Sequence, residues 1–215
     1  MSKQRAFSVH LSEEGSMAGK TFLKAGILAA VALSLSACAS LTPPPQTFDL
    51  NPPTRAVAGT RVANIQVLVP EPTTNSTLDS ERIVVMPSTQ TVEYLGGSQW
   101  SDRLPRLVQL QLVQAFQNSG RVAAVGIPGQ GLAIDYQVVI EIRHFEISYA
   151  SGSPVANIEL AVKALNDKTG IVRATRIFKV SEPVSGQGSG QFVAALNSAF
   201  DRLSLELVEW FVRAA

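Results

Sequence analysis

The sequence predicts a single α/β domain in which two long helices pack on a mixed, largely antiparallel sheet. Two segments, near residues 101–118 and 191–212, have apolar side chains at the spacing of amphipathic helices. Seven shorter segments have the apolar runs or the two-residue alternation that are typical of strands. The chain has 215 residues, a length that corresponds to one domain and at most two.

The composition excludes several classes of protein. With 18 Lys and Arg against 17 Asp and Glu, the formal net charge is +1. A charge so close to zero argues against a nucleic-acid-binding protein, which needs a basic surface. The chain is 46% hydrophobic and 16% charged, too apolar to be mainly disordered. One Cys and two His argue against a disulfide framework and a metal site, and we expect no cofactor.

Residues 1–37 are predicted to be a signal peptide. Ala25 to Ala37 (AGILAAVALSLSA) carries no charge, and its 13 residues fit the apolar core of a signal, about 7–15 residues long. A membrane span would need about 20. Lys20 and Lys24 supply the positive flank upstream.

The true start of translation is expected at Met17. Glu13 and Glu14 put negative charge where a signal peptide is normally basic. A chain that begins at Met17 has two lysines and no acids before the apolar core.

The segment Leu35-Ser36-Ala37-Cys38 resembles the bacterial lipobox, which implies a diacylglycerol on the Cys38 thiol, cleavage before it and acylation of the new amine. Ala37 to Ala39 is also an A-x-A site that would release a soluble protein. The lone Cys favours lipidation, because an unpaired thiol in an exported protein needs an explanation. At the position after Cys38, Asp would resemble an inner-membrane retention signal. This chain has Ala39 there, so we expect the lipoprotein to be anchored in the outer membrane.

Residues 38–59 are predicted to be a lipidated Cys followed by a tether, and residues 60–215 to be the folded domain. Proline favours extended geometry and lacks an amide donor, and this segment contains five: Pro43, Pro44, Pro45, Pro52 and Pro53. The alternative is that Thr47 to Leu50 forms a short edge strand on the domain.

The first half of the domain is predicted to hold three strands and a helix. The strands are residues 62–69, ended by Pro70; 82–86, ended by Pro87; and 91–95, ended by Gly96 and Gly97. A helix should follow, capped by Ser101 or Asp102, with Pro105 in its first turn and Gly120 at its end. Its buried face is predicted to comprise Leu104, Leu107, Val108, Leu112, Ala115 and Phe116.

The remaining face of this helix is rich in glutamine, and this glutamine-rich face carries no charge. It includes Gln109, Gln111, Gln114 and Gln117. Simple solvent exposure and contact with a partner protein are both consistent with such a face.

The second half is predicted to form an antiparallel meander and a final helix. A short strand at 122–125 precedes strands at 135–149, 158–165 and 171–180, with a hairpin turn at 166–170. Fifteen residues from 135 to 149 would extend about 50 Å, so a bend or bulge is expected. Along this strand, one face should carry Val139, Glu141, Arg143, Phe145 and Ile147, and the opposite face Val138, Ile140, Ile142 and His144. Ser189 should cap a helix from Gln191 to Val212 whose buried face comprises Phe192, Ala195, Leu196, Ala199, Leu203, Leu207, Trp210 and Phe211.

No segment predicts catalytic chemistry. The run Gly186-x-Gly188-x-Gly190 does not match a dinucleotide-binding loop and is interpreted as a linker. His144 is not expected to be a catalytic base, because the sequence has no nucleophile elbow such as G-x-S-x-G. Glu141 and Glu146 should face opposite sides of their strand, and Trp100 is expected to pack against the helix start rather than to stack on a ligand.

Four segments, taken together, resemble a known family. They are RVANIQVLVP (residues 61–70), ERIVVM (81–86), VEYLGGSQWSDRLPRLVQLQLVQAF (92–116) and DYQVVIEIRHFEI (135–147). In this order, after a lipobox and before a late aromatic helix, they resemble the ABC-type transport auxiliary lipoproteins. The resemblance covers roughly residues 50–212 and is most specific over 94–104.

The resemblance implies a non-enzymatic partner of an MCE-type transporter, which moves lipids between the membranes of double-membraned bacteria. It implies an MCE-domain protein as partner, helices packed on a mixed sheet, and no catalytic residues. The alternative function is a structural envelope lipoprotein that assembles as a homo-oligomer or with other envelope proteins. A lipid-anchored hydrolase lacks a nucleophile–base pair.

A protein without catalytic chemistry acts through its surfaces. The positions that core packing leaves unexplained are the predicted loop with Gly96, Gly97 and Gln99, the helix positions Gln111 and Gln114, and the glycine loop at 186–190. We expect the partner protein to contact one of these.

Overall fold

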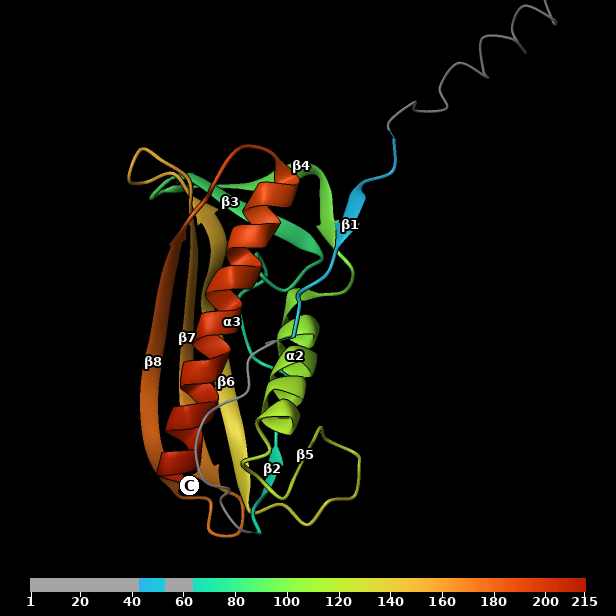
Figure 1. Ribbon diagram of the computed structural model, residues 1–215, viewed down its shortest axis with the longest axis vertical. Coiled ribbons are helices and arrows are strands. Elements are labelled where there is room, and N and C mark those ends of the chain that lie inside the picture. The colour runs from blue at the N-terminus through green and yellow to red at the C-terminus, as the bar shows by residue number, and fades with distance from the viewer. Residues whose placement is uncertain (1–42, 53–63) are drawn as a thin grey trace, which may run out of the picture. The chain divides into compact units, whose positions relative to one another are not determined.

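The computed structural model describes residues 43–52 and 64–215, which form a mixed eight-stranded sheet with two helices packed on it (Figure 1). This confirms the predicted fold class. The signal peptide, the lipobox-like segment and Cys38 lie outside the described residues. Within the described part of the chain, neither helix is long and apolar enough to cross a membrane.

The sheet is built around β6 (Tyr136–Ser148), which has neighbours along both edges. One edge pairs in parallel with β2 (Gln66–Leu68) and with β3 (Arg82–Ser88). The other pairs antiparallel with β7 (Val155–Asn166), which pairs with β8 (Val172–Pro183). β5 (Ala124–Gly126) extends the sheet beyond β2, and β4 (Thr91–Trp100) and β1 (Gln46–Phe48) extend it beyond β3.

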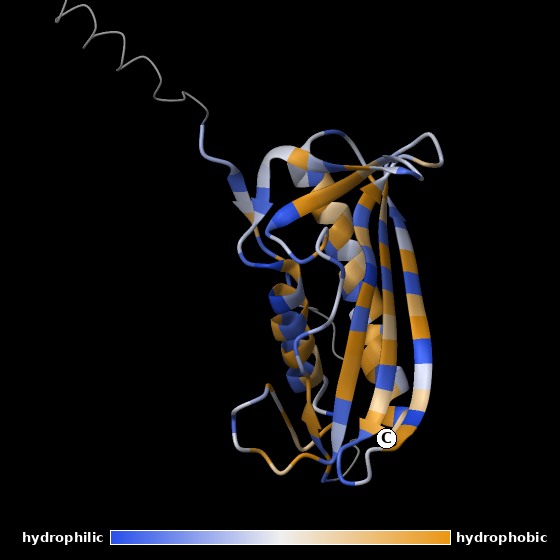
Figure 2. Cartoon of the chain, turned by 180° about the vertical axis from the view of Figure 1, so that it is seen from behind, coloured by the Kyte–Doolittle hydropathy of each residue, from blue (hydrophilic) through white to orange (hydrophobic). Residues whose placement is uncertain are grey.

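The predicted meander of three antiparallel strands is confirmed as β6, β7 and β8, with its turn at residues 166–170. Polar and apolar residues alternate along these strands when they are seen from the side away from the helices (Figure 2). One face of the meander packs on the helices and the other, here called the outer face, is available to solvent.

The expected irregularity in the longest strand is a β-bulge at Arg143. Ile142 pairs with Leu160 and His144 pairs with the next residue, Glu159, so Arg143 is the extra residue. The bulge reverses the alternation that the sequence predicted, because two successive side chains then lie on the outer face.

As a result, Phe145 and Ile147 join the buried face with Val138 and Ile140. The sequence had placed Phe145 and Ile147 on the opposite face, which is wrong for the part of β6 that follows the bulge.

The predicted break at Gly96 and Gly97 is also wrong, because β4 continues through both glycines to Trp100. The register between β3 and β4 shifts here: Val84 pairs with Tyr94, and Arg82 with Gln99. Gly97 has a φ of 63°, a conformation that glycine adopts without strain and that lets the extra residues bulge out of the ladder.

Helix α2 (Leu104–Ser119) has the predicted first-turn proline, the predicted buried face and a left-handed Gly120 at its end. Its predicted cap is wrong: the N-cap residue is Arg103, without a side-chain capping bond. The Ser101 hydroxyl instead donates to Asp49 Oδ1, at 3.0 Å. The carboxylate of Asp102 accepts from the amide of Arg103.

Helix α3 (Ser189–Ala214) begins two residues earlier than predicted, and Ser189 does not cap it. Its hydroxyl donates to Gln46 Oε1 at 3.2 Å. The predicted face of α3 is buried except for Trp210, which is partly buried.

An aromatic cluster joins the sheet to both helices. The ring of Phe145 lies 6.0 Å from that of Trp100 and 6.2 Å from that of Phe200, measured between centroids. Phe116 of α2 packs edge-on against Phe211 of α3 at 5.4 Å. Trp100 is thus a core residue, as its expected packing role required.

Residues 44–52 are part of the domain, since the compact unit begins at Pro44. A strand does form here, as the alternative interpretation allowed: β1 pairs in parallel with the end of β4. Leu50 is completely buried. The amide of Asn51 donates to Asn197 Oδ1 in α3, at 2.6 Å.

We predict that Leu50→Ala destabilises the whole domain by about 2–5 kcal/mol, because it empties a fully buried site. Thr47→Ala is the matched control, since this exposed position in the same segment should change the free energy of unfolding by no more than about 0.5 kcal/mol. Denaturant titration of both variants measures the difference. A change for Leu50→Ala as small as that expected for the control would show that this segment contributes nothing to the fold.

Candidate functional site

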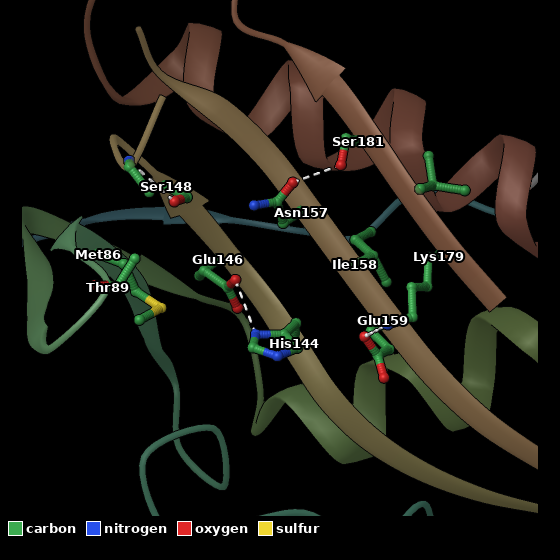
Figure 3. A pocket seen from close by; sticks show the side chains of 12 residues that line it. Met86, Thr89, His144, Glu146, Ser148, Asn157, Ile158, Glu159, Lys179 and Ser181 are labelled. Atoms are coloured by element: carbon green, nitrogen blue, oxygen red, sulfur yellow. Dashed lines mark hydrogen bonds and ion pairs between the residues drawn. The ribbon is translucent and has the colours of Figure 1, made fainter. Parts of the chain in front are cut away.

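The outer face of the sheet contains a hollow of about 380 Å³ beside the β3–β4 hairpin (Figure 3). It lies where the ends of β3, β6, β7 and β8 meet. Its polar side chains come mainly from outward-facing positions of the meander: His144, Glu146, Ser148, Asn157, Glu159, Lys179 and Ser181.

Glu146 is the most buried charged group of the hollow, with a side chain that is 5% exposed. One carboxylate oxygen accepts from the Phe145 amide at 2.8 Å, and the other lies 3.1 Å from Nδ1 of His144. Burial raises the pKa of Glu146 above its usual range, although both contacts favour the charged form. His144 and Glu146 are two residues apart and therefore share a face, and the β6 bulge is the reason that this face is the outer one.

Glu159, on the neighbouring strand, is fully compensated by cations. Lys179 Nζ lies 2.8 Å from one of its carboxylate oxygens and an Arg143 nitrogen lies 3.6 Å from the other. The hydrogen bond from Lys179 lowers the pKa of Glu159, so this carboxylate stays charged. The hollow therefore presents balanced charges rather than a field of one sign.

The bulge also corrects the expectation that Glu141 and Glu146 face opposite sides of β6. Arg143 bonds to Glu141 at 3.1 Å and approaches Glu159, which lines the hollow together with Glu146. Both acids therefore lie on the outer face. Arg143 bridges Glu141 to Glu159, an arrangement unlike a pair of carboxylates poised for acid–base catalysis.

The serines of the hollow are not arranged as nucleophiles. The Ser181 hydroxyl donates to Asn157 Oδ1 at 2.7 Å, and the Ser148 hydroxyl accepts from the Ala150 amide. Within the described residues, no group of three or more His, Cys, Asp or Glu side chains could hold a metal ion. The geometry of the hollow suits hydrogen bonding rather than covalent chemistry.

Two of the predicted surface glutamines are buried. Gln109 is 2% exposed, and its amide nitrogen donates to the carbonyl of Val69 at 2.8 Å. Gln111 is 6% exposed, and its Oε1 has no hydrogen-bond partner among the described residues. The prediction of an exposed glutamine face is wrong for these two, whereas Gln114 and Gln117 are exposed.

Of the other predicted positions, Gly96, Gly97 and Gln99 belong to strand β4 rather than to a loop. Gly96 and Gly97 are exposed in the β4 bulge, and Gln99 is half-buried opposite Thr47 of β1. The glycine loop at 186–190 joins β8 to α3 at the same end of the domain as the start of β1 (Figure 1).

An aromatic groove that the sequence did not predict lies at this end, between the β3–β4 hairpin and the start of α3. The groove has a volume of about 470 Å³, and the side chains that define it are Tyr94, Leu95, Tyr149 and Phe192. The rings of Tyr149 and Phe192 meet edge-on at 6.5 Å. No sequence periodicity links these residues, because they come from three separate elements.

Comparison with known proteins places these features in one family. The profile described as "ABC-type transport auxiliary lipoprotein component" matches residues 48–208. The uncharacterized protein bll6063 of Bradyrhizobium diazoefficiens is 31% identical over 169 residues, which are 78% of this chain and 45% of that protein. The chain thus spans about half the length of this curated relative.

Solved structures share the fold. Protein XCC0632 from Xanthomonas campestris is 30% identical, with a TM-score of 0.67 over 79% of this chain and 93% of that one. The hypothetical protein CT253 from Chlamydia trachomatis has 12% identity and a TM-score of 0.51 over 71% of this chain and all of that one, a likeness of fold alone.

The family match spans α2, most of α3 and nearly all of the described sheet, including the β6 bulge and the β4 glycines. Lipoproteins are anchored to a membrane of the cell envelope, and an auxiliary transport component is not a class of enzyme. The chain belongs to the ABC-type transport auxiliary lipoprotein family.

Proposed function

We propose that this protein is an outer-membrane lipoprotein, anchored through Cys38 on the periplasmic face, that serves an MCE-type ABC transporter moving lipids between the two membranes. The observation that carries the proposal is the family match over residues 48–208 directly after a lipobox-like segment that ends at Cys38. Acyl chains on that residue would contribute roughly 0.8 kcal/mol per buried methylene, so two or three chains give stable anchoring.

Residue Ala39 supports the outer membrane as the destination. It is small and uncharged, and it occupies the position at which Asp would resemble an inner-membrane retention signal. A lipoprotein held there can meet transporter components in the periplasm.

Contact with the transporter is proposed through the exposed side of α2. Gln114 and Gln117 are exposed there, beside the half-buried Leu110 and Val113. Interface centres are depleted in charged residues, and uncharged polar groups lose water at lower cost than charged ones. Gln111 no longer belongs to this surface, because it is buried.

We predict that Cys38→Ala moves the protein from the membrane fraction into the soluble periplasm or leaves it as an uncleaved precursor. Without the thiol there is no group to receive the diacylglycerol. Membrane fractionation and labelling with radioactive palmitate measure the change. The anchor would be contradicted if the variant and the wild type partition equally to the membrane and the wild type incorporates no radioactive palmitate.

Ala39→Asp is the matched control for the destination. This variant keeps the lipid and should shift from outer-membrane to inner-membrane fractions. A protein that stays in the same fraction in both forms would argue against the proposed outer-membrane location.

For the partner surface, we predict that the double variant Gln114→Glu, Gln117→Glu loses most of its co-purification with the MCE-domain protein. Four closely spaced carboxylate oxygens would have to be desolvated at the contact. Both positions are exposed, so the free energy of unfolding should change by no more than about 0.5 kcal/mol each. Affinity purification and a thermal melt of the same preparation check both points.

Thr175→Glu places one new carboxylate on the exposed outer face of β8 and should leave co-purification intact. If the α2 variant retains both its melt and its partner, the transporter binds elsewhere on the domain.

A further inference from the structure

One end of the domain is almost free of charged residues. Three connections at this end contain no Asp, Glu, Lys or Arg: the β3–β4 hairpin at 87–92, the β6–β7 turn at 149–154 and the β8–α3 connection at 183–191. The strand registers place them together, since Met86 pairs with Ser148, and Val155 with Pro183. We call these three connections the charge-free end.

The opposite end of the meander has a different character. The β7–β8 turn contains Asp167 and Lys168, and Lys168 bonds to Asp135 at 2.6 Å. The twelve residues of β7 separate the two ends by about 40 Å. The domain is therefore polarised along its strands, with charged groups at one end and uncharged groups at the other.

Apolar and aromatic side chains are accessible at the charge-free end. Val92, near the hairpin tip, is 48% exposed. The groove formed by Tyr94, Tyr149 and Phe192 opens beside it. Its charged neighbours are Glu93, on its lining, and Arg82, whose guanidinium carbon lies 3.6 Å from the centroid of the Tyr94 ring. Tyrosine rings, with an apolar body and a polar tip, are enriched where hydrocarbon meets water at a membrane surface.

The chain reaches the domain from Cys38 at this same end. Gln46, the first residue of β1, accepts a hydrogen bond from Ser189 at the start of α3. Eight peptide units separate Cys38 from Gln46, which span at most about 28 Å when fully extended. An anchor at Cys38 therefore keeps the charge-free end close to the bilayer, and the charged end lies about 40 Å further along the strands.

We propose that the charge-free end rests on the surface of the membrane, with Val92 and the Tyr94–Tyr149–Phe192 groove in the layer of phospholipid headgroups. The proposal extends the proposed function, because it takes Cys38 as the anchor point. A headgroup layer without net charge offers no compensation for desolvated charges, and this end brings few to it. The tether raises the effective concentration of the surface, so individually weak contacts suffice.

The test is hydrogen exchange of the chain from Cys38 onward, attached to phosphatidylcholine vesicles, compared with the same chain free in solution. The protein is used as lipidated in cells, and also with Cys38 joined to a maleimide lipid in the vesicle. We expect several-fold slower amide exchange on vesicles within residues 87–92, 149–154 and 184–191. Exchange within residues 166–170 should not change.

A matched pair of variants tests whether the contact depends on the chemistry of this end. Val92→Glu adds a carboxylate at an exposed apolar position of the charge-free end and should abolish the protection. Ile171→Glu does the same at the charged end, at a residue that is 56% exposed, and should leave the protection intact.

Equal exchange on vesicles and in solution would overturn the proposal, as would protection of residues 166–170 instead. Protection that appears only when the MCE-domain protein is added would assign this end to a protein partner and would overturn it too. The maleimide-linked sample separates this result from the proposed function: an unmodified Cys38 in cells would contradict the natural anchor, while the vesicle measurement would still decide the orientation.

Discussion

The β-bulge at Arg143 is the feature on which the rest of the structure depends. Without an extra residue there, a regular β6 could not place both Ile142 and Phe145 on the buried face. The bulge lets Phe145 reach Trp100 and Phe200, which ties the sheet to the start of α2 and to α3. It also turns His144 and Glu146 outward to build the polar hollow. One residue thus determines both the core and the outer face.

A second constraint is the segment that leads into the domain. Leu50 fills a buried site, and Asp49 and Gln46 accept hydrogen bonds from Ser101 and Ser189, at the starts of the two helices. These contacts fix the end of the domain at which the chain enters. They give the domain a defined polarity, with the entering segment and the uncharged connections at one end and the charged turn of β7 and β8 at the other. Such polarity suits a protein that works between a membrane and a partner.

The sequence was informative wherever a pattern repeats locally. Both helices, the meander with its turn, and a bulge somewhere in the longest strand follow from periodicity and turn residues. The exact position of the bulge does not, because Arg143 resembles any other outward-facing residue. The errors at Gly96 and Gly97 have a similar cause, since a glycine pair can end a strand or supply the left-handed conformation of a bulge.

The remaining errors come from contacts between distant segments. Ser101 and Ser189 have the right chemistry for caps, but their hydroxyls bond to the entering segment instead. Gln109 is buried because Val69 offers it a carbonyl 40 residues away. The absence of charge on that helix face was a usable signal, since an uncharged amide can be buried when it finds a partner. The three connections of the charge-free end can also be recognised in the sequence by their lack of charged residues. Only the strand registers show that they lie at the same end of the domain.

Deletion of Arg143 tests the central claim most directly, with deletion of Val139 as the reference. If Arg143 is the extra residue of a bulge, its removal leaves Ile142 and Phe145 facing the core, and the variant should unfold in one cooperative thermal transition. Deletion of Val139, in the regular part of β6, should abolish that transition, because the side chains on one side of the deletion turn to the wrong face. Loss of the transition in the Arg143 deletion would contradict the bulge, and with it the arrangement of the core and the outer face.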